Sequence, residues 1–352
     1  MRVTMKDVAD VMGVSVMTVS NAFNRPDQLS VDLRDRILVR AQKMGYGAPN
    51  AAARNLRQGR TNCYGVVFSE SLNYAFSDPY SVLWLSGLSQ SLEQAGKTMM
   101  LLPVSQPSPA NLDLVRRASV DGIAGLCASG PVLEVAKQTG LPVVTTALAG
   151  ADGSWVAIDD HAAGRQVGRH VRRLGHRDVA LVVEQVMPIH DADPIEQSLA
   201  DYRVKLDDYR HQGLYDLWVR VDGLISGLGD QLDLRVVSAG LNSRRSGRLA
   251  AELLLDQLAR PTAIVCVSDV LAFGVLDATH DRGLVPGRDV TVIGFDDLPE
   301  AERQGLTTVH QPIHDKGRLV GELLLDPAQG PRQVTLPHTL MVRATSAPPR
   351  SN

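Results

Sequence analysis

The feature that most constrains the fold is an alternation of short apolar runs with helical patterns, from Tyr64 to about residue 294. Parallel strands need a crossover between them, usually a helix, so the alternation predicts βαβ units. The predicted strands are Gly65–Phe68, Met99–Pro103, Gly122–Cys127, Pro142–Thr146, Trp155–Ile158, Val179–Val183, Arg235–Ser238, Ala263–Val267 and Val290–Gly294. They are too many for one sheet. We therefore expect an α/β body of two doubly wound parallel-sheet subdomains with a cleft between them.

The first 46 residues have a different pattern, which predicts a helix-turn-helix head of three short helices. Thr4, Ser15 and Ser30 are suitable N-caps for helices that begin directly after them. Only Gly13 and Val14 separate the first two helices, and Gly13 suits the left-handed end of a helix. Such a short connection forces a tight helix-turn-helix. A plain three-helix bundle without a DNA role is the alternative.

Charge favours the DNA role. Residues 1–60 contain ten Lys and Arg against five Asp and Glu, whereas the remainder contains 26 against 34. A basic head on an acidic body suggests that the head meets a polyanion. Residues 47–61 predict a hinge in which Asn50 caps a short helix, Ala51–Leu56. That helix is too short to be stable alone, so we expect it to fold on a partner; a plain linker is the alternative.

Other classes of protein lack support in the sequence. Cys63, Cys127 and Cys266 lie far apart, which excludes a disulfide scaffold and a zinc site. No apolar run approaches a membrane span, and the N-terminus carries charges where a signal peptide has its apolar core, so we expect a cytoplasmic protein. GxSxG, GxxxxGK[ST] and HExxH are absent, as is GxGxxG after the first strand. The sequence therefore predicts no enzyme, no catalytic residue, no metal and no cofactor.

The chain resembles the LacI/GalR family of bacterial transcriptional regulators over nearly its whole length. In the head and hinge the resemblance rests on Met5–Ala9, Gly13–Ser15, Thr18–Ser20, Pro49-Asn50, Ala53 and Leu56. In the body it rests on Leu174–Arg177, Ser268-Asp269, Ile293–Asp297, Leu306–Val309 and Gln311-Pro312. It implies a helix-turn-helix head and a periplasmic-binding-protein-like body with a ligand in the cleft.

The resemblance implies that the second helix lies in the DNA major groove. The residues so assigned to DNA are Thr4, Ser15, Val16, Met17, Thr18, Ser20 and Asn21 in the head and Asn50, Ala53, Leu56 and Arg57 in the hinge. Val16 and Met17 are apolar and can contact thymine methyls, whereas Asn21 could pair with adenine. Thr18 and the helix N-terminus are expected on phosphate. Packing on the third helix is the alternative for Val16 and Met17.

Leu56 matches the family residue that wedges a base step in the minor groove. On its short basic helix Leu56 has little other apolar surface to pack against. Inserting Leu56 unstacks two base pairs, and the cost is offset because the bent duplex makes more contacts with the protein. Simple packing between domains is the alternative. Leu56 is thus expected to serve specific binding more than non-specific binding.

The resemblance also implies a ligand site built from Asp159, Arg220, Asp269 and Asp296. Asp269 and Asp296 each follow a predicted strand, and Arg220 matches a family helix start. Carboxylates around one Arg suit a polyhydroxylated ligand such as a sugar, because they accept hydroxyl protons and the guanidinium donates back. Tyr74 and Phe76 could stack on a sugar ring. Helix capping is the alternative for Asp269, and core packing for Tyr74 and Phe76.

The resemblance places the body at 62–345, with an N-subdomain of about 62–159 and 290–312. The C-subdomain takes about 160–289 and 313–345, and residues 346–352 are expected to be disordered. The chain departs from the family in a long acidic connection at 184–219 and in lacking an aromatic residue around Asn242.

These observations predict a repressor whose affinity for its operator is switched by a small molecule. Helix-turn-helix heads read paired half-sites, so we expect a homodimer on a pseudo-palindromic double-stranded DNA operator. The sign of the switch stays open. One alternative keeps the DNA role but has a partner protein, or no ligand, in control; another is a solute-binding receptor without a DNA role.

Overall fold

The computed structural model describes residues 3–46, 60–105, 108–128, 130–146, 153–184, 193–211, 215–229, 233–327 and 330–350. The chain divides into two compact units. One, the head, comprises Met1–Asn62 with Ser119–Asp121, and the other, the body, comprises Cys63–Ala118 with Gly122–Asn352. Among the described residues, no helix is both long and apolar enough to cross a membrane.

The head contains α1 (Met5–Met12), α2 (Val16–Asn24), a 3-10 turn (Pro26–Gln28) and α3 (Val31–Lys43). The three predicted N-caps are confirmed: Thr4, Ser15 and Ser30 each accept a hydrogen bond from a backbone N–H of the helix that follows. Gly13 ends α1 at φ 65°, in the left-handed region. The head core consists of the buried apolar side chains Val8, Ala9, Val19, Ala22, Ile37 and Ala41.

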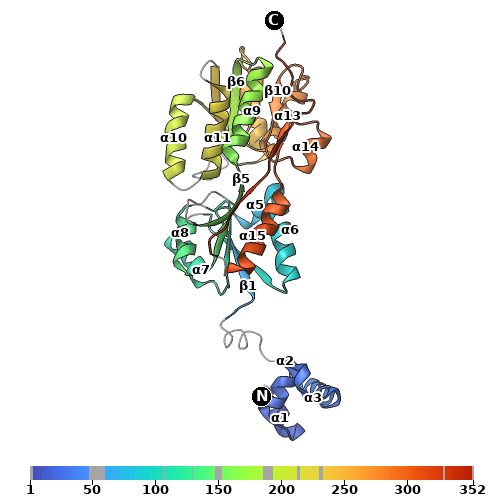
Figure 1. Ribbon diagram of the computed structural model, residues 1–352. Helices are drawn as coiled ribbons and strands as arrows, with labels where there is room; N and C mark the ends of the chain where they lie inside the picture. Colours follow the sequence, from blue (N-terminus) through green and yellow to red (C-terminus); the bar gives the residue numbers. More distant parts are fainter. Residues whose placement is uncertain are drawn as a thin grey trace. The chain divides into compact units, whose positions relative to one another are not determined.

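The first half of the body, the N-half, has a six-stranded parallel sheet in the order β12-β5-β4-β3-β1-β2. Its strands are β1 (Cys63–Phe68), β2 (Thr98–Pro103), β3 (Ile123–Leu126), β4 (Val143–Thr145), β5 (Ser154–Ile158) and β12 (Gln333–Leu336). Its helices are α5 (Leu72–Ser77), α6 (Pro79–Gln94), α7 (Pro109–Arg117), α8 (Gly130–Gln138) and α15 (Ile313–Leu325). Helices α6 and α15 pack together (Figure 1).

The second half, the C-half, has a five-stranded sheet in the order β10-β9-β6-β8-β7, parallel except for β7. Its strands are β6 (Asp178–Val183), β7 (Ile195–Ser198), β8 (Asp233–Ser238), β9 (Ala263–Cys266) and β10 (Thr291–Ile293). Its helices are α9 (Asp160–Leu174), α10 (Leu199–His211), α11 (Tyr215–Leu228), α12 (Arg244–Leu255), α13 (Asp269–Asp281) and α14 (Pro299–Arg303). A short antiparallel pair, β11 (Thr308–His310) and β13 (Thr339–Met341), continues from β10. The predicted α/β fold with two parallel sheets is confirmed.

The last two segments of the body belong to the opposite halves from those predicted. β10, within 290–312, pairs with β9 of the C-half, whereas β12, within 313–345, pairs with β5 of the N-half. The chain therefore crosses between the halves after β5, after β11 and after β12. The error has a physical cause. Strand pairing joins residues that are distant in the sequence, and the local pattern of an apolar run does not indicate which strand will pair with it.

The acidic connection 184–219, whose role the sequence leaves open, contains an antiparallel edge strand, β7, and the helix α10. One expectation, about the end of the chain, is corrected. The start of the tail is held rather than disordered: the ring of His170 contacts the Ser346 hydroxyl at 3.0 Å, and His176 Nε2 contacts the carbonyl of Ala347 at 2.9 Å. Burial lowers the pKa of both histidines, which favours neutral rings in these contacts with the tail.

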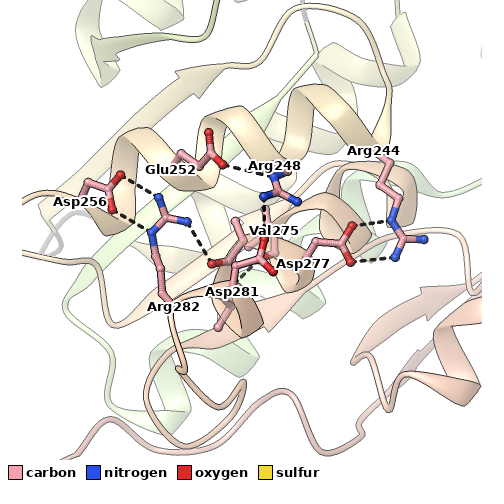
Figure 2. Close-up of polar contacts among 10 residues, drawn as sticks. Arg244, Arg248, Glu252, Asp256, Val275, Asp277, Asp281 and Arg282 are labelled. Carbon is pink, nitrogen blue, oxygen red and sulfur yellow. Dashed lines mark hydrogen bonds and ion pairs between the residues drawn. The ribbon is translucent and has the colours of Figure 1, made fainter.

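Helices α12 and α13 pack closely against each other in the C-half. A Cβ added to Gly247 would lie 2.1 Å from the carbonyl oxygen of Leu271, so glycine is what allows the two backbones to approach. Ion pairs lie along the outside of the pair (Figure 2): Arg244 bonds Asp277 at 2.6 and 2.8 Å, and Arg282 bonds Asp256 at 2.8 and 2.7 Å.

Candidate functional site

The exposed end of α2 is the candidate DNA-reading surface. Val16 and Met17 are 45% and 70% exposed, so neither is part of the head core. Ser15 holds the start of the helix by accepting the Thr18 N–H at 3.0 Å, and the two hydroxyls lie 2.9 Å apart. Two exposed apolar side chains on the first turn of a capped helix are positioned for contact with another molecule rather than for packing on α3.

Two other predicted DNA residues of the head have partners in the structure. Thr4 forms a capping box with Asp7, whose carboxylate accepts from the Thr4 backbone N–H at 2.7 Å. Asn21 donates its amide to Gln28 at 3.3 Å, so reading adenine requires it to exchange this partner. Ser20 is partly exposed on the same helix. The predicted hinge contacts, Asn50, Ala53, Leu56 and Arg57, lie outside the described residues.

In the body, polar side chains from both halves meet beyond the carboxyl ends of the strands. The Tyr74 hydroxyl on α5 accepts a hydrogen bond at 3.0 Å from the amide of Asn242, which follows β8. Asn242 in turn accepts the Ser268 hydroxyl, after β9, at 2.6 Å. Such strand ends are where open α/β sheets bind ligands. Tyr74 of the other half thus lies beside Asn242, around which the sequence has no aromatic residue.

Arg220 is held by several contacts at this junction. It lies within α11, not at a helix start as predicted, and its guanidinium donates to Oδ1 of Asp160 at 3.0 and 2.8 Å. It also donates to the Val267 carbonyl at 2.7 Å and lies 3.8 Å from the ring centroid of Phe295. Helices α9 and α11 can approach closely because Gly164 has no side chain. The arrangement fixes a cation beside the predicted ligand residues.

Asp296 is buried next to this cation. Its backbone has φ 122°, a strained value for a residue other than glycine. Its Oδ1 accepts the Gln311 amide at 2.7 Å, and the Gln311 carbonyl accepts the Lys316 ammonium at 2.7 Å. Burial raises the pKa of Asp296 well above its usual range, although Arg220 opposes the shift. This relay is a second point of contact between the halves, because Lys316 lies on α15 of the N-half.

Three further acidic side chains at the junction were not predicted: Glu70, Asp78 and Glu184. Burial raises the pKa of Glu70 and of Glu184 to about 7. The charges of Glu184 and Asp78 add to the shift of Glu70, whereas for Glu184 the charge of Arg220 opposes the shift and that of Asp78 adds to it. Burial also raises the pKa of Asp78. Glu70 follows β1 and Glu184 follows β6, so the rule that selected Asp269 and Asp296 would have found them. Glu184 was instead included in the acidic connection.

Three predicted ligand residues lie elsewhere or have other roles. Asp159 is exposed and caps α9 by accepting the Ala162 N–H at 2.8 Å; its buried neighbour Asp160 is the residue that holds Arg220. Phe76 is 64% exposed, which leaves Tyr74 as the aromatic at the junction. Asp269 is fully buried, and its two oxygens accept from Thr308 and Leu298. Asp269 therefore holds the loop after β10, and Ser268 rather than Asp269 caps α13.

Comparison with protein families gives two matches. Residues 4–50 match the model of bacterial regulatory proteins of the lacI family, and residues 169–346 match that of a periplasmic binding protein-like domain. An HTH-type transcriptional regulator of Mycolicibacterium smegmatis is 38% identical over 366 residues, which cover 99% of this chain and 97% of that protein. One of Mycobacterium tuberculosis is 37% identical over 358 residues, covering 99% and 98%.

Solved structures show the same fold. A LacI-family regulator from Corynebacterium glutamicum is 28% identical with a TM-score of 0.69, covering 98% of both chains. The lac repressor dimer bound to operator and an anti-inducer is 22% identical with a TM-score of 0.75, covering 99% and 100%. A transcriptional regulator in complex with cellobiose is 24% identical with a TM-score of 0.64, covering 98% and 100%.

Proposed function

Because this chain belongs to the lacI family of bacterial regulatory proteins and is a DNA-binding transcriptional regulator, we propose that it is a cytoplasmic repressor whose operator affinity is switched by a small polyhydroxylated molecule. The molecule binds where the two halves of the body meet. The single observation that carries the proposal is the hydrogen bond between Tyr74 and Asn242, because it puts a polar site across two halves that a ligand can draw together or separate.

The head reads the operator through α2. Val16 and Met17 are exposed on its first turn and contact thymine methyls, while the helix N-terminus and Thr18 hold phosphate. Leu56 of the hinge enters the minor groove. Each head reads one half-site, so the protein acts as a homodimer on a pseudo-palindromic site. The lac repressor dimer on its operator, which shares the fold, supports this arrangement.

The body senses the molecule through Tyr74, Arg220 and Asp296, which come from both halves. Arg220 donates to ligand hydroxyls, and Asp296 accepts from them. The cellobiose complex of a regulator with the same fold supports a sugar-like ligand. Ligand binding changes how the halves sit against each other, and the hinge transmits the change to DNA, a coupling between two distinct sites.

Selection of DNA from a random duplex library by the full-length protein, followed by sequencing, tests the DNA role. We expect enrichment of one motif with two inverted half-sites at physiological salt. Wild-type protein that enriches no motif would support the solute-binding receptor instead. The Val11→Ala variant, which changes an exposed apolar residue of α1, is the control and should enrich the same motif.

A further inference from the structure

Three hydrogen bonds tie the end of the predicted hinge to the loop between α7 and β3. The Asp121 carboxylate accepts the backbone N–H and the hydroxyl of Thr61 at 2.6 and 2.9 Å. It also accepts the backbone N–H of Asn62 at 2.8 Å. Ser119–Asp121 accordingly belongs to the same compact unit as Met1–Asn62, although the two segments are far apart in the sequence. We call the contacts of Asp121 with Thr61 and Asn62 the hinge anchor.

The backbone of the hinge anchor has a conformation that suits this contact. Asn62 has φ 58°, in the left-handed region, which asparagine adopts more readily than most residues other than glycine. The turn allows the N–H groups of two successive residues to reach the two oxygens of one carboxylate. Strand β1 begins at the next residue, Cys63, so the hinge anchor fixes the chain immediately before it enters the sheet of the N-half.

The residues on both sides of Asp121 are packed. Val120 is buried, and the carbonyl of Gly122 accepts the Gly65 N–H of β1 at 2.9 Å. A Cβ on Gly122 would lie 3.1 Å from the Tyr64 ring, so the absence of a side chain lets this loop lie against β1. Packed neighbours limit where the Asp121 carboxylate can lie, and the hinge anchor therefore holds the chain at a defined point.

The hinge anchor is not part of a core. Thr61, Asn62 and Asp121 are all partly exposed, so water can replace the hydrogen bonds if the carboxylate is lost, and the cost in stability is small. Its main effect is on the freedom of the chain. Ordering a segment on binding reduces affinity, and a segment that is already held at one end has less freedom to lose.

We propose that Asp121 is a positioning residue for operator recognition, which fixes the end of the hinge and passes movement of the N-half to it. The inference rests on the proposed function, in which the hinge places Leu56 in the minor groove. Specific binding needs the hinge contacts in one register, whereas non-specific binding depends on phosphate contacts. The hinge anchor should therefore matter for the operator and much less for DNA of random sequence.

Fluorescence anisotropy with the full-length protein tests this role, on the operator obtained by DNA selection and on a random-sequence duplex of equal length. Asp121→Ala removes all three acceptor contacts. We expect its operator binding to be weaker by about tenfold or more, and its binding to the random duplex to stay within about twofold of wild type. Tm should fall by no more than about 3 degrees. Loss of a negative charge by itself favours DNA binding, so weaker binding reports the position of the hinge and not the charge.

Two further variants grade the effect, and a third is the control. Asp121→Asn keeps one oxygen for Thr61, but its NH2 group cannot accept the Asn62 N–H, so its operator affinity should lie between those of wild type and Asp121→Ala. Thr61→Val removes only the hydroxyl and should weaken operator binding by no more than about threefold. Asp113→Ala removes a carboxylate of α7 that pairs with Arg117, so it changes the net charge equally and should keep wild-type affinities.

Three results would overturn the proposal: operator binding by Asp121→Ala within about twofold of wild type, an equal loss on both duplexes, or an equal loss in Asp113→Ala. If Asp121→Ala is insoluble, the ratio of the two affinities in Asp121→Asn decides in its place. The proposed function fails separately. Wild-type protein that selects no motif removes that function, whereas a selected motif that Asp121→Ala binds as tightly as wild type removes only the hinge anchor.

Discussion

Tyr74 and Asn242 are joined by a hydrogen bond of 3.0 Å that runs from one half of the body to the other. Asn242 also accepts the Ser268 hydroxyl at 2.6 Å, and the helix that follows it, α12, is ion-paired to α13 (Figure 2). Tyr74 lies on α5, a short helix of six residues. A ligand that takes either partner of this bond removes a contact between the two halves.

Tyr74→Phe should weaken the junction without harming either half. Removal of the hydroxyl deletes one hydrogen bond and leaves the Asn242 amide without this acceptor, at a cost of about 1 kcal/mol in the free energy of unfolding. Urea denaturation measures that cost. Ser89→Ala, which removes an exposed hydroxyl of α6, is the control. A Tyr74→Phe variant as stable as wild type would show that the bond does not hold the halves together.

Met17→Ala should lower operator affinity and leave the fold intact. Met17 is 70% exposed, so its truncation removes little buried area and Tm should be unchanged. Loss of an apolar contact to a base edge should weaken specific binding by about five- to tenfold. Fluorescence anisotropy on operator and on random-sequence duplex separates the two binding modes. An equal loss on both duplexes would contradict a reading role for Met17.

Gly247→Ala should destabilise the C-half severely. Its Cβ would lie 2.1 Å from a backbone oxygen of α13, and backbone cannot move aside as a flexible side chain does. We expect a loss of more than about 3 kcal/mol, or insoluble protein. Gly283→Ala is the comparison: its Cβ would meet open space at φ 67°, for a cost of about 1 kcal/mol. Similar losses in the two variants would refute the close packing of α12 on α13.

Glu184→Gln should stabilise the protein in a pH-dependent way. Burial raises the folded-state pKa of Glu184 from 4.5 to about 7, so the folded state binds more protons than the unfolded state between these values. Ionisation therefore costs stability as pH rises through this window, and the full cost is present above pH 7. Gln is uncharged at every pH and mimics the neutral form of Glu184. The gain in the free energy of unfolding over wild type should therefore be absent at pH 4.5 and about 1 to 3 kcal/mol at pH 8. Equal gains at both pH values would show that the charge is not responsible.

The parts of this structure that depend on local chemistry could be predicted from the sequence, and those that depend on distant pairing could not. The helix starts after Thr4 and Ser15 follow from side chains that bond the next turn of the same chain. β7, in contrast, exists because a polar segment finds the edge of β8, which is some 40 positions away in the register that pairs Ile195 with Ser238. Such pairing leaves no local signature, and the assignment of β10 and β12 to their halves failed for the same reason.

The candidate site shows the same division. Asp296 and Arg220 were identified because they match the family pattern, and the structure brings them close together. The resemblance points to Asp159, but the residue that bonds Arg220 is its neighbour Asp160. A shift of one residue decides whether a side chain at the start of α9 faces solvent or α11, and the sequence does not specify that rotation. Asp78 was missed because an N-cap of a helix gives the same sequence signal whether its side chain is exposed or buried.

The most direct test of the account is the operator dissociation constant, measured by fluorescence anisotropy with and without a polyhydroxylated molecule that raises the Tm of the full-length protein. For wild-type protein we expect the constant to change at least tenfold when this molecule saturates the site, and for Tyr74→Phe, which lacks the hydroxyl that joins the halves, we expect a smaller change at the same concentration. A wild-type constant that stays the same while the molecule is bound would contradict the central claim that the junction of the two halves controls the DNA-reading head.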